Sequence, residues 1–124
     1  MMRSVRAPII TIAQGAAHSA GLLILQGGDM RLMMLNSTLF YHAPIAGMSV
    51  MTPVMMQDAT DGYTWAYDTM NEIIRTRSKI SKRNWKKEFT NYQAARTFGA
   101  EEAKKLGLVD DYITYIKKAP LVLA

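Results

Sequence analysis

The chain has 124 residues, the size of one ordinary domain. It carries 15 Lys and Arg against 10 Asp and Glu, a formal charge of +5, and it has no Cys. The lack of Cys excludes a disulfide-stapled scaffold and any cysteine-ligated metal, iron–sulfur or thiol site. With 49% apolar and 20% charged residues, the composition predicts a globular domain rather than a disordered chain.

The first third of the chain predicts strands around one helix. Residues 8–13 form a continuous apolar, β-branched run that is typical of a strand buried on both faces. The small-residue segment 16–25 suits a helix packed closely on a sheet. Residues 31–35 and 38–42 are predicted as two further short strands, separated by a turn.

One long helix is predicted from about residue 53 to residue 80, with Pro53 in its first turn. Its stripe recurs at alternating spacings of three and four, at Met56, Ala59, Tyr63, Ala66, Met70, Ile73, Arg77 and Ile80. About seven turns are too long for so small a domain, so part of the stripe is expected to meet another subunit. The alternative is an ordinary core helix broken at Gly62.

The last third predicts short elements: helices over residues 84–93 and 101–106, and a strand over residues 108–113. Alternation of strands and helices over the whole chain argues an α/β fold with a mainly parallel sheet and flanking helices.

Basic residues cluster at positions 75–79 and 82–87, close to Trp85 and Phe89. Such a stripe could contact phosphate while its aromatic rings stack on bases. A solvated helix face explains the same pattern more simply, so we do not expect a nucleic-acid partner.

Two uncharged stretches, residues 7–28 and 32–57, contain Gly, Pro and polar residues that disfavour a membrane-spanning helix. We interpret both as buried structure, with a secretion signal at the basic start of the chain as a minor alternative.

Few residues can carry chemistry. The only histidines are His18 and His42, no ligand spacing points to a metal, and no glycine pattern of a phosphate-binding loop is present. Ser19 lies at a predicted strand-to-helix junction, where helix N–H groups could stabilise an oxyanion, and His42 at a strand end could be its general base. His18 is a poorer base, because adjacent helical residues point about 100° apart. The simpler alternative makes Ser19 a packing residue and His42 a satisfied polar group.

Three motifs in order add a family resemblance: Gly15-Ala-Ala-His-Ser-Ala-Gly21, then residues 34–44 with Leu-Asn-Ser and Phe-Tyr-His-Ala-Pro, then residues 100–110 with Ala-Glu-Glu-Ala and Gly-Leu-Val-Asp. Together they resemble the proteolytic subunit of the Clp protease, ClpP, over roughly residues 8–113. The resemblance implies one ClpP/crotonase-like domain over residues 1–124, whose long helix is the family's projecting handle helix.

The resemblance also implies a function. It makes Ser19 the nucleophile, His42 the general base and the backbone N–H of Ala20 an oxyanion donor in a serine-type endopeptidase that cleaves unfolded polypeptides. The expected assembly is a homo- or hetero-oligomeric ring of ClpP-like subunits fed by an AAA+ unfoldase. That partner would use ATP, and no cofactor is expected in this chain. The expected setting is the cytoplasm or an organellar matrix.

Two departures from the family pattern keep alternatives open. Counting back from residue 100 without gaps puts the position of the triad aspartate at Ala95, and a shifted alignment would recruit Asn91 instead. The family's first βαβ units, which supply a second oxyanion donor, are not found ahead of residues 8–13. A non-catalytic ClpP-like structural subunit is therefore the main alternative, and a crotonase-like acyl-thioester enzyme is the third.

Overall fold

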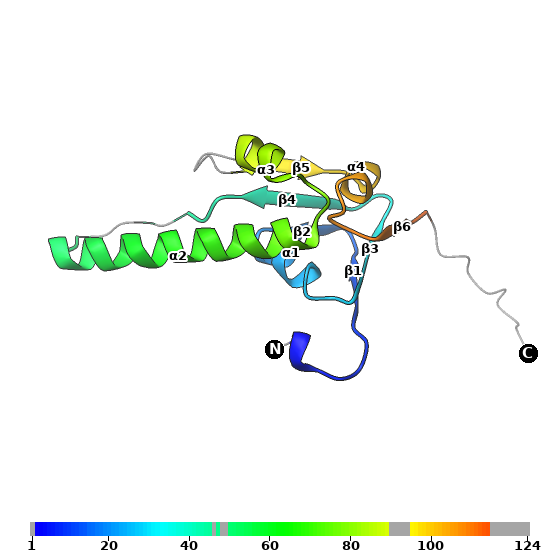
Figure 1. The fold of residues 1–124 in the computed structure, drawn as a ribbon, viewed down its shortest axis with the longest axis horizontal. Helices are drawn as coiled ribbons and strands as arrows, with labels where there is room; N and C mark the ends of the chain where they lie inside the picture. Colours follow the sequence, from blue (N-terminus) through cyan, green and yellow to red (C-terminus); the bar gives the residue numbers. More distant parts are fainter. Residues whose placement is uncertain (1, 46, 48–49, 90–94, 115–124) are drawn as a thin grey trace, which may run out of the picture.

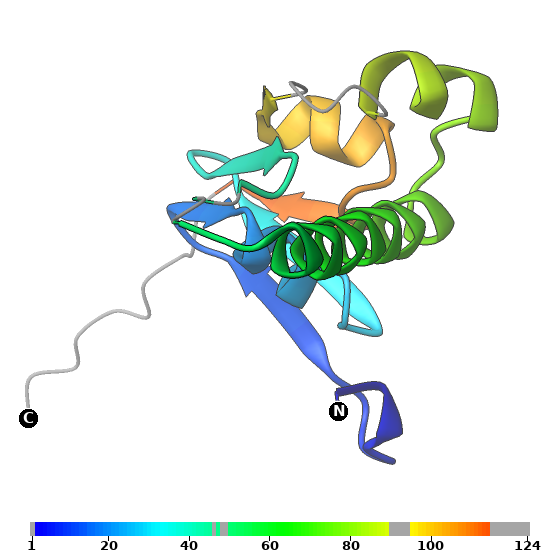
Figure 2. The same ribbon diagram turned by 90° about the vertical axis from the view of Figure 1, so that its left-hand side faces the viewer.

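The computed structural model describes residues 2–45, 47, 50–89 and 95–114 (Figure 1). In chain order its elements are a 3₁₀ helix η1 (Met2–Ser4), β1 (Ile10–Ala13), β2 (Ala16–His18), α1 (Ala20–Leu25), β3 (Met30–Met34), β4 (Thr38–His42), α2 (Pro53–Arg77), α3 (Lys82–Phe89), β5 (Ala95–Phe98), α4 (Ala100–Lys105) and β6 (Asp111–Ile113). In two perpendicular views α3 and α4 lie at one end of the molecule and β1 descends toward the N-terminal segment at the other (Figures 1 and 2).

The strands form two three-stranded sheets, ordered β1-β3-β6 and β2-β4-β5. The first sheet is parallel throughout, whereas the second pairs β2 with β4 in parallel and β4 with β5 antiparallel. The predicted α/β class with mainly parallel pairing is therefore confirmed. Strand β5 has no counterpart among the predicted elements, and it matters for the site because it borders the strand that ends at His42.

Two predicted boundaries are wrong. The segment predicted as a helix over residues 16–25 is divided, since Ala16–His18 pairs with β4 as strand β2 and the helix begins only at Ala20. The strand predicted over residues 108–113 is reduced to Asp111–Ile113, because Leu108 and Val109 are buried in the turn that leads into it. In both cases tertiary pairing decided where the element begins. The helix predicted over residues 84–93 is present as Lys82–Phe89, and positions 90–94 lie outside the described residues.

The long helix α2 is continuous through Gly62, so the broken-helix alternative is wrong. The Thr52 hydroxyl accepts a hydrogen bond from the Met55 amide and caps the start, and the helix ends at Arg77 rather than at residue 80. Its buried residues are Tyr67, Met70, Asn71 and Ile74, all in the C-terminal half. The N-terminal half projects past the sheets (Figure 1), as predicted for a helix too long for this domain, and it exposes Met56 of the stripe together with Val54.

An aromatic cluster occupies the space between α2, α3 and the second sheet. Trp85 and Phe89 are 4% and 1% exposed, and their rings stack with centroids 4.3 Å apart. The Tyr41 hydroxyl donates to Asn71 Oδ1 at 2.7 Å, and burial raises the pKa of Tyr41 well above its ordinary value. Because both aromatic rings of the basic segment are core residues, they are not available to stack on nucleic-acid bases.

A buried arginine on β3 forms hydrogen bonds to three other parts of the chain. The Arg31 side chain, 7% exposed, makes a two-pronged contact with Asp110, with N···O distances of 2.6 and 3.2 Å. It also donates to Gln26 Oε1 at 2.6 Å and to the carbonyl of Arg77 at 2.7 Å. Hydrogen bonds from this one guanidinium therefore connect β3 to the end of α1, the end of α2 and the turn before β6.

Strand β1 differs most from its prediction. It lies at the edge of its sheet, and Ile10 and Ile12 are 59% and 53% exposed, so it is not buried on both faces within the described chain.

Among the helices that the structure describes, none combines the length and the apolar character needed to cross a bilayer.

Candidate active site

Ser19 joins β2 to α1 in a conformation that non-glycine residues rarely adopt, with φ 52° and ψ −116°. Its amide donates to the Phe40 carbonyl at 2.8 Å, which holds the turn against β4. Although Ser19 is the N-cap residue of α1, its hydroxyl makes no capping hydrogen bond to the helix. The structure thus places the half-buried Ser19 on a strained strand-to-helix turn, with its hydroxyl not used to cap the helix.

Ala20 is the first residue of α1, so its N–H has no acceptor within the helix. Ala20 is exposed and directly follows Ser19, so this donor lies next to the serine in the chain. An N–H in this place is suited to stabilising negative charge that develops on an oxygen next to the serine.

His42 is the last residue of β4 and is half-buried. Its Nδ1 lies 2.7 Å from the carbonyl oxygen of Ala43. Since a carbonyl can only accept, Nδ1 is the protonated nitrogen in this contact, and the neutral ring keeps the lone pair on Nε2. This is the tautomer that a general base for a serine requires.

Strand pairing brings the serine and the histidine to neighbouring strand ends. His18 pairs with Phe40 in the parallel ladder, so Ser19 follows β2 at the same edge at which His42 ends β4. No hydrogen bond joins the Ser19 hydroxyl to the His42 ring in the described residues. Instead, His42 bonds to Ala43, and His18 bonds through Nε2 to the Thr38 hydroxyl at 3.0 Å.

The position expected for a third catalytic residue is directly opposite His42. In the antiparallel ladder of β4 and β5, the Cα partner of His42 is Ala95, the residue at which the count without gaps put the triad aspartate. Directly opposed residues have Cβ atoms about 4.5–5.5 Å apart, so a carboxylate here would reach the imidazole. The methyl group cannot, and the Ala43 carbonyl is the acceptor that Nδ1 uses instead. Asn91, the other candidate, lies outside the described residues.

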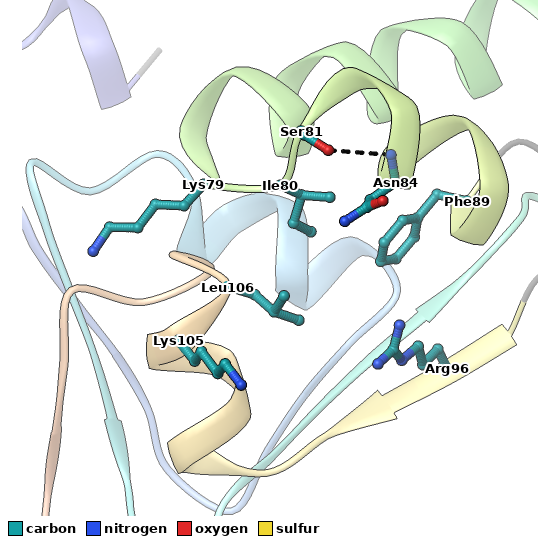
Figure 3. Close-up of a pocket in the computed structure, with 8 residues that line it drawn as sticks. All are labelled: Lys79, Ile80, Ser81, Asn84, Phe89, Arg96, Lys105 and Leu106. Atoms are coloured by element: carbon teal, nitrogen blue, oxygen red, sulfur yellow. Dashed lines mark hydrogen bonds between the residues drawn. The ribbon is translucent and has the colours of Figure 1, made fainter.

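A hollow lies away from these residues, and no sequence pattern predicted it. It measures about 280 Å³ and lies between α3, β5 and α4, where Ile80 and Leu106 face each other with Lys105 and Arg96 at the rim (Figure 3). Arg96 already pairs with Glu102 at 2.5 Å. None of the lining residues belongs to β2, α1 or β4, so this hollow is separate from Ser19 and His42.

In the part of the chain that the structure describes, no group of three or more His, Asp or Glu is placed to hold a metal ion.

Comparisons with known proteins agree with the order of the motifs. The family model described as Clp protease matches residues 1–115. The ATP-dependent Clp protease proteolytic subunit of Deinococcus radiodurans is 30% identical over 114 residues, which cover 90% of this chain and 54% of that protein. The ATP-dependent Clp protease proteolytic subunit 1 of Thermobifida fusca is 30% identical over 126 residues, covering 94% and 52%. The chain thus spans about half the length of these curated relatives.

Proposed function

This chain belongs to the Clp protease family, and from that premise we propose that it is a ClpP-like serine endopeptidase subunit that hydrolyses unfolded polypeptide. The observation that carries the proposal is the conformation of Ser19. A strained, non-glycine residue at a strand-to-helix turn is costly to hold, and such strain is concentrated at functional sites. The tautomer of His42 supports the same proposal.

The chemistry is acyl transfer in two steps. Ser19 Oγ attacks the peptide carbonyl carbon while His42 Nε2 takes the hydroxyl proton. The Ala20 N–H donates to the oxyanion, the C–N bond breaks, and His42 returns the proton to the leaving amine. Water then hydrolyses the ester, with the proton again passing through Nε2. Throughout, the Ala43 carbonyl accepts from the Nδ1–H and so leaves the lone pair on Nε2.

The proposed setting is a ring of ClpP-like subunits, homo- or hetero-oligomeric, fed by an AAA+ unfoldase that spends the ATP. The exposed apolar side chains on the projecting half of α2, among them Val54 and Trp65, offer a surface for contact between subunits. The names of both relatives contain "ATP-dependent". We propose the cytoplasm or an organellar matrix as the compartment, with no cofactor held by this chain.

Labelling with a serine-directed fluorophosphonate tests the assignment, because it needs an activated serine but no particular peptide substrate. We expect one adduct, located at Ser19 by peptide mass spectrometry, in the chain assembled with its natural partners. Ser19→Ala is expected to abolish labelling, and His42→Gln to slow it by at least about a hundredfold. Ser4, an exposed serine outside the site, supplies the control variant Ser4→Ala, which is expected to label like the unsubstituted chain. Absence of an adduct at Ser19 in the assembled sample would contradict the peptidase proposal.

Ala95 favours a second candidate, a structural ClpP-like subunit without catalytic activity. A methyl group opposite His42 cannot stabilise an imidazolium, and disabling the aspartate of a serine-protease triad lowers turnover about 10⁴-fold in the well-studied case. Ala95→Asp separates the candidates. A catalytic subunit is expected to label at least about tenfold faster with this carboxylate, whereas a structural subunit that has lost its site stays unlabelled.

A further inference from the structure

The hollow between α3, β5 and α4 combines an apolar interior with a basic rim. In Figure 3, Ile80 and Phe89 lie on one side of it and Leu106 on the other, with Lys105 and Arg96 along the edge. Phe89 is 1% exposed, whereas Ile80 and Leu106 are only half-buried, so these two aliphatic side chains are the apolar surface that is open to a ligand. None of the described residues that line the hollow is acidic.

Two lysines of this hollow carry charge that the described residues do not neutralise. Arg96 pairs with Glu102 at 2.5 Å, but none of the ion pairs in the described part of the chain uses Lys79 or Lys105, and both lysines are exposed. Residues 73–87, which supply most of one wall, contain four Lys and three Arg but no Asp or Glu. The hollow therefore favours an anionic ligand.

The start of α3 opens on the same hollow. Ser81 and Asn84 both line it, and the Ser81 hydroxyl accepts from the Asn84 amide at 3.3 Å (Figure 3). The amides of Lys82 and Arg83, the first two of the helix, have no acceptor within the helix. The partial positive charge at this helix end strengthens the preference for an anion that the lysines create.

The apolar interior decides which kind of anion fits. A phosphate group would use the lysines alone and would leave Ile80 and Leu106 in contact with water. Nucleic-acid bases need an aromatic surface for stacking, but the rings of Trp85 and Phe89 are buried. An acidic peptide satisfies both parts of the hollow, because its carboxylates pair with the lysines while an apolar side chain covers the aliphatic surface. A volume of about 280 Å³ is small for a ligand pocket and suits one such side chain.

From this complementarity of charge and apolar surface, we propose that the hollow binds a peptide segment of a partner protein in which one aliphatic side chain is flanked by Asp or Glu. The aliphatic side chain contacts Ile80 and Leu106, and the flanking carboxylates pair with Lys79 and Lys105. The hollow shares no lining residue with β2, α1 or β4, so this inference does not depend on catalysis by Ser19.

A synthetic peptide, acetyl-Asp-Asp-Leu-Asp-Asp-amide, tests the proposal in an NMR titration of the full, isotope-labelled chain. We expect one-to-one binding that shifts the amide resonances of Ile80 and Leu106. Because the carboxylates remain near solvent, the dissociation constant is expected to rise at least about tenfold between about 50 mM and about 500 mM NaCl. Replacing the Leu of the peptide with Gly removes the apolar contact and is expected to weaken binding about tenfold.

Two neighbouring lysines separate binding in the hollow from general attraction to a basic surface. Lys105→Gln removes a charge at the hollow and is expected to weaken binding about threefold, and about tenfold when combined with Lys79→Gln. Lys104→Gln is the matched control, because Lys104 is not among the lining residues and bonds to Asp111 at 2.8 Å. It is expected to bind like the unsubstituted chain. All three lysines are exposed, and circular dichroism checks that the variants stay folded.

Three results would overturn the proposal. Equal weakening by Lys104→Gln and Lys105→Gln would show attraction to the basic surface without a site. Equal binding of the Leu and Gly peptides, with tighter binding of inorganic tripolyphosphate, would assign the hollow to phosphate groups instead. Unshifted resonances of Ile80 and Leu106 at saturating peptide would show that the hollow is not where the peptide binds.

Discussion

Replacing Asp110 with Asn tests whether the buried Arg31 holds the fold together. The two carboxylate oxygens of Asp110 accept from Arg31 Nε and Nη2, and one of them also accepts from the Arg31 amide at 2.8 Å. Asparagine offers one acceptor oxygen and presents an NH₂ donor in the other place. One Arg31 donor would then face another donor, and the guanidinium would keep its charge in the core without a counter-ion.

The expected cost follows from the unequal burial of the two partners. Removing one member of a buried ion pair costs about 3–5 kcal/mol, because the other charge remains desolvated. The Arg31 side chain is 7% exposed but that of Asp110 is 41% exposed, so water replaces part of the lost interaction and the cost falls to about 2 kcal/mol. For a domain of this size, that corresponds to a decrease of about 8 °C in Tm.

The neighbouring residue supplies the matched control. Asp111 bonds to Lys104 at 2.8 Å, but both side chains are about half exposed. Because exposed ion pairs contribute little to stability, Asp111→Asn is expected to leave Tm close to that of the unsubstituted chain. Thermal unfolding followed by circular dichroism compares the two variants. Equal Tm values for Asp110→Asn and the unsubstituted chain would refute the reasoning.

The ion pair between Arg31 and Asp110 also predicts how the stability of the fold depends on pH. The hydrogen bond from Arg31 holds the pKa of Asp110 below its ordinary value in the folded chain. A lowered folded pKa means that this stabilisation is fully present above the unfolded pKa of about 3.9 and is lost as pH falls through the folded pKa. Urea unfolding between pH 6 and pH 3 is therefore expected to show a smaller acid-induced loss of stability in Asp110→Asn.

Two further substitutions probe the packing. Tyr41→Phe removes the buried hydroxyl that donates to Asn71, and it is expected to lower the free energy of unfolding by about 1–2 kcal/mol in urea titrations. Gly107 and Gly15 both have positive φ, at 72° and 84°. A Cβ added at Gly107 would lie 2.8 Å from the Lys79 backbone nitrogen. A Cβ added at Gly15 would meet nothing within 4 Å. Gly15→Ala is expected to cost about 1 kcal/mol and Gly107→Ala at least about 1 kcal/mol more, in the same assay; equal costs would contradict this.

The sequence was most informative where a local pattern coincided with a tertiary role. The strand that ends at His42 occupies its predicted place, and the long helix begins at Pro53 as predicted. Ala95, the position that the count assigns to the missing carboxylate, pairs with His42 in the ladder of β4 and β5. These predictions depended on the order and spacing of residues, which the chain itself carries.

Other features depended on contacts between distant segments. Ala16–His18 has helix-forming residues but becomes strand β2, because its backbone pairs with β4. The stripe on α2 predicted Ile73 on the inner face, yet Ile74 is buried and Ile73 is 39% exposed, since the helix packs with a face rotated by one residue. The tautomer of His42 also follows from a carbonyl contact that no residue type specifies. Sequence periodicity alone carries none of this information.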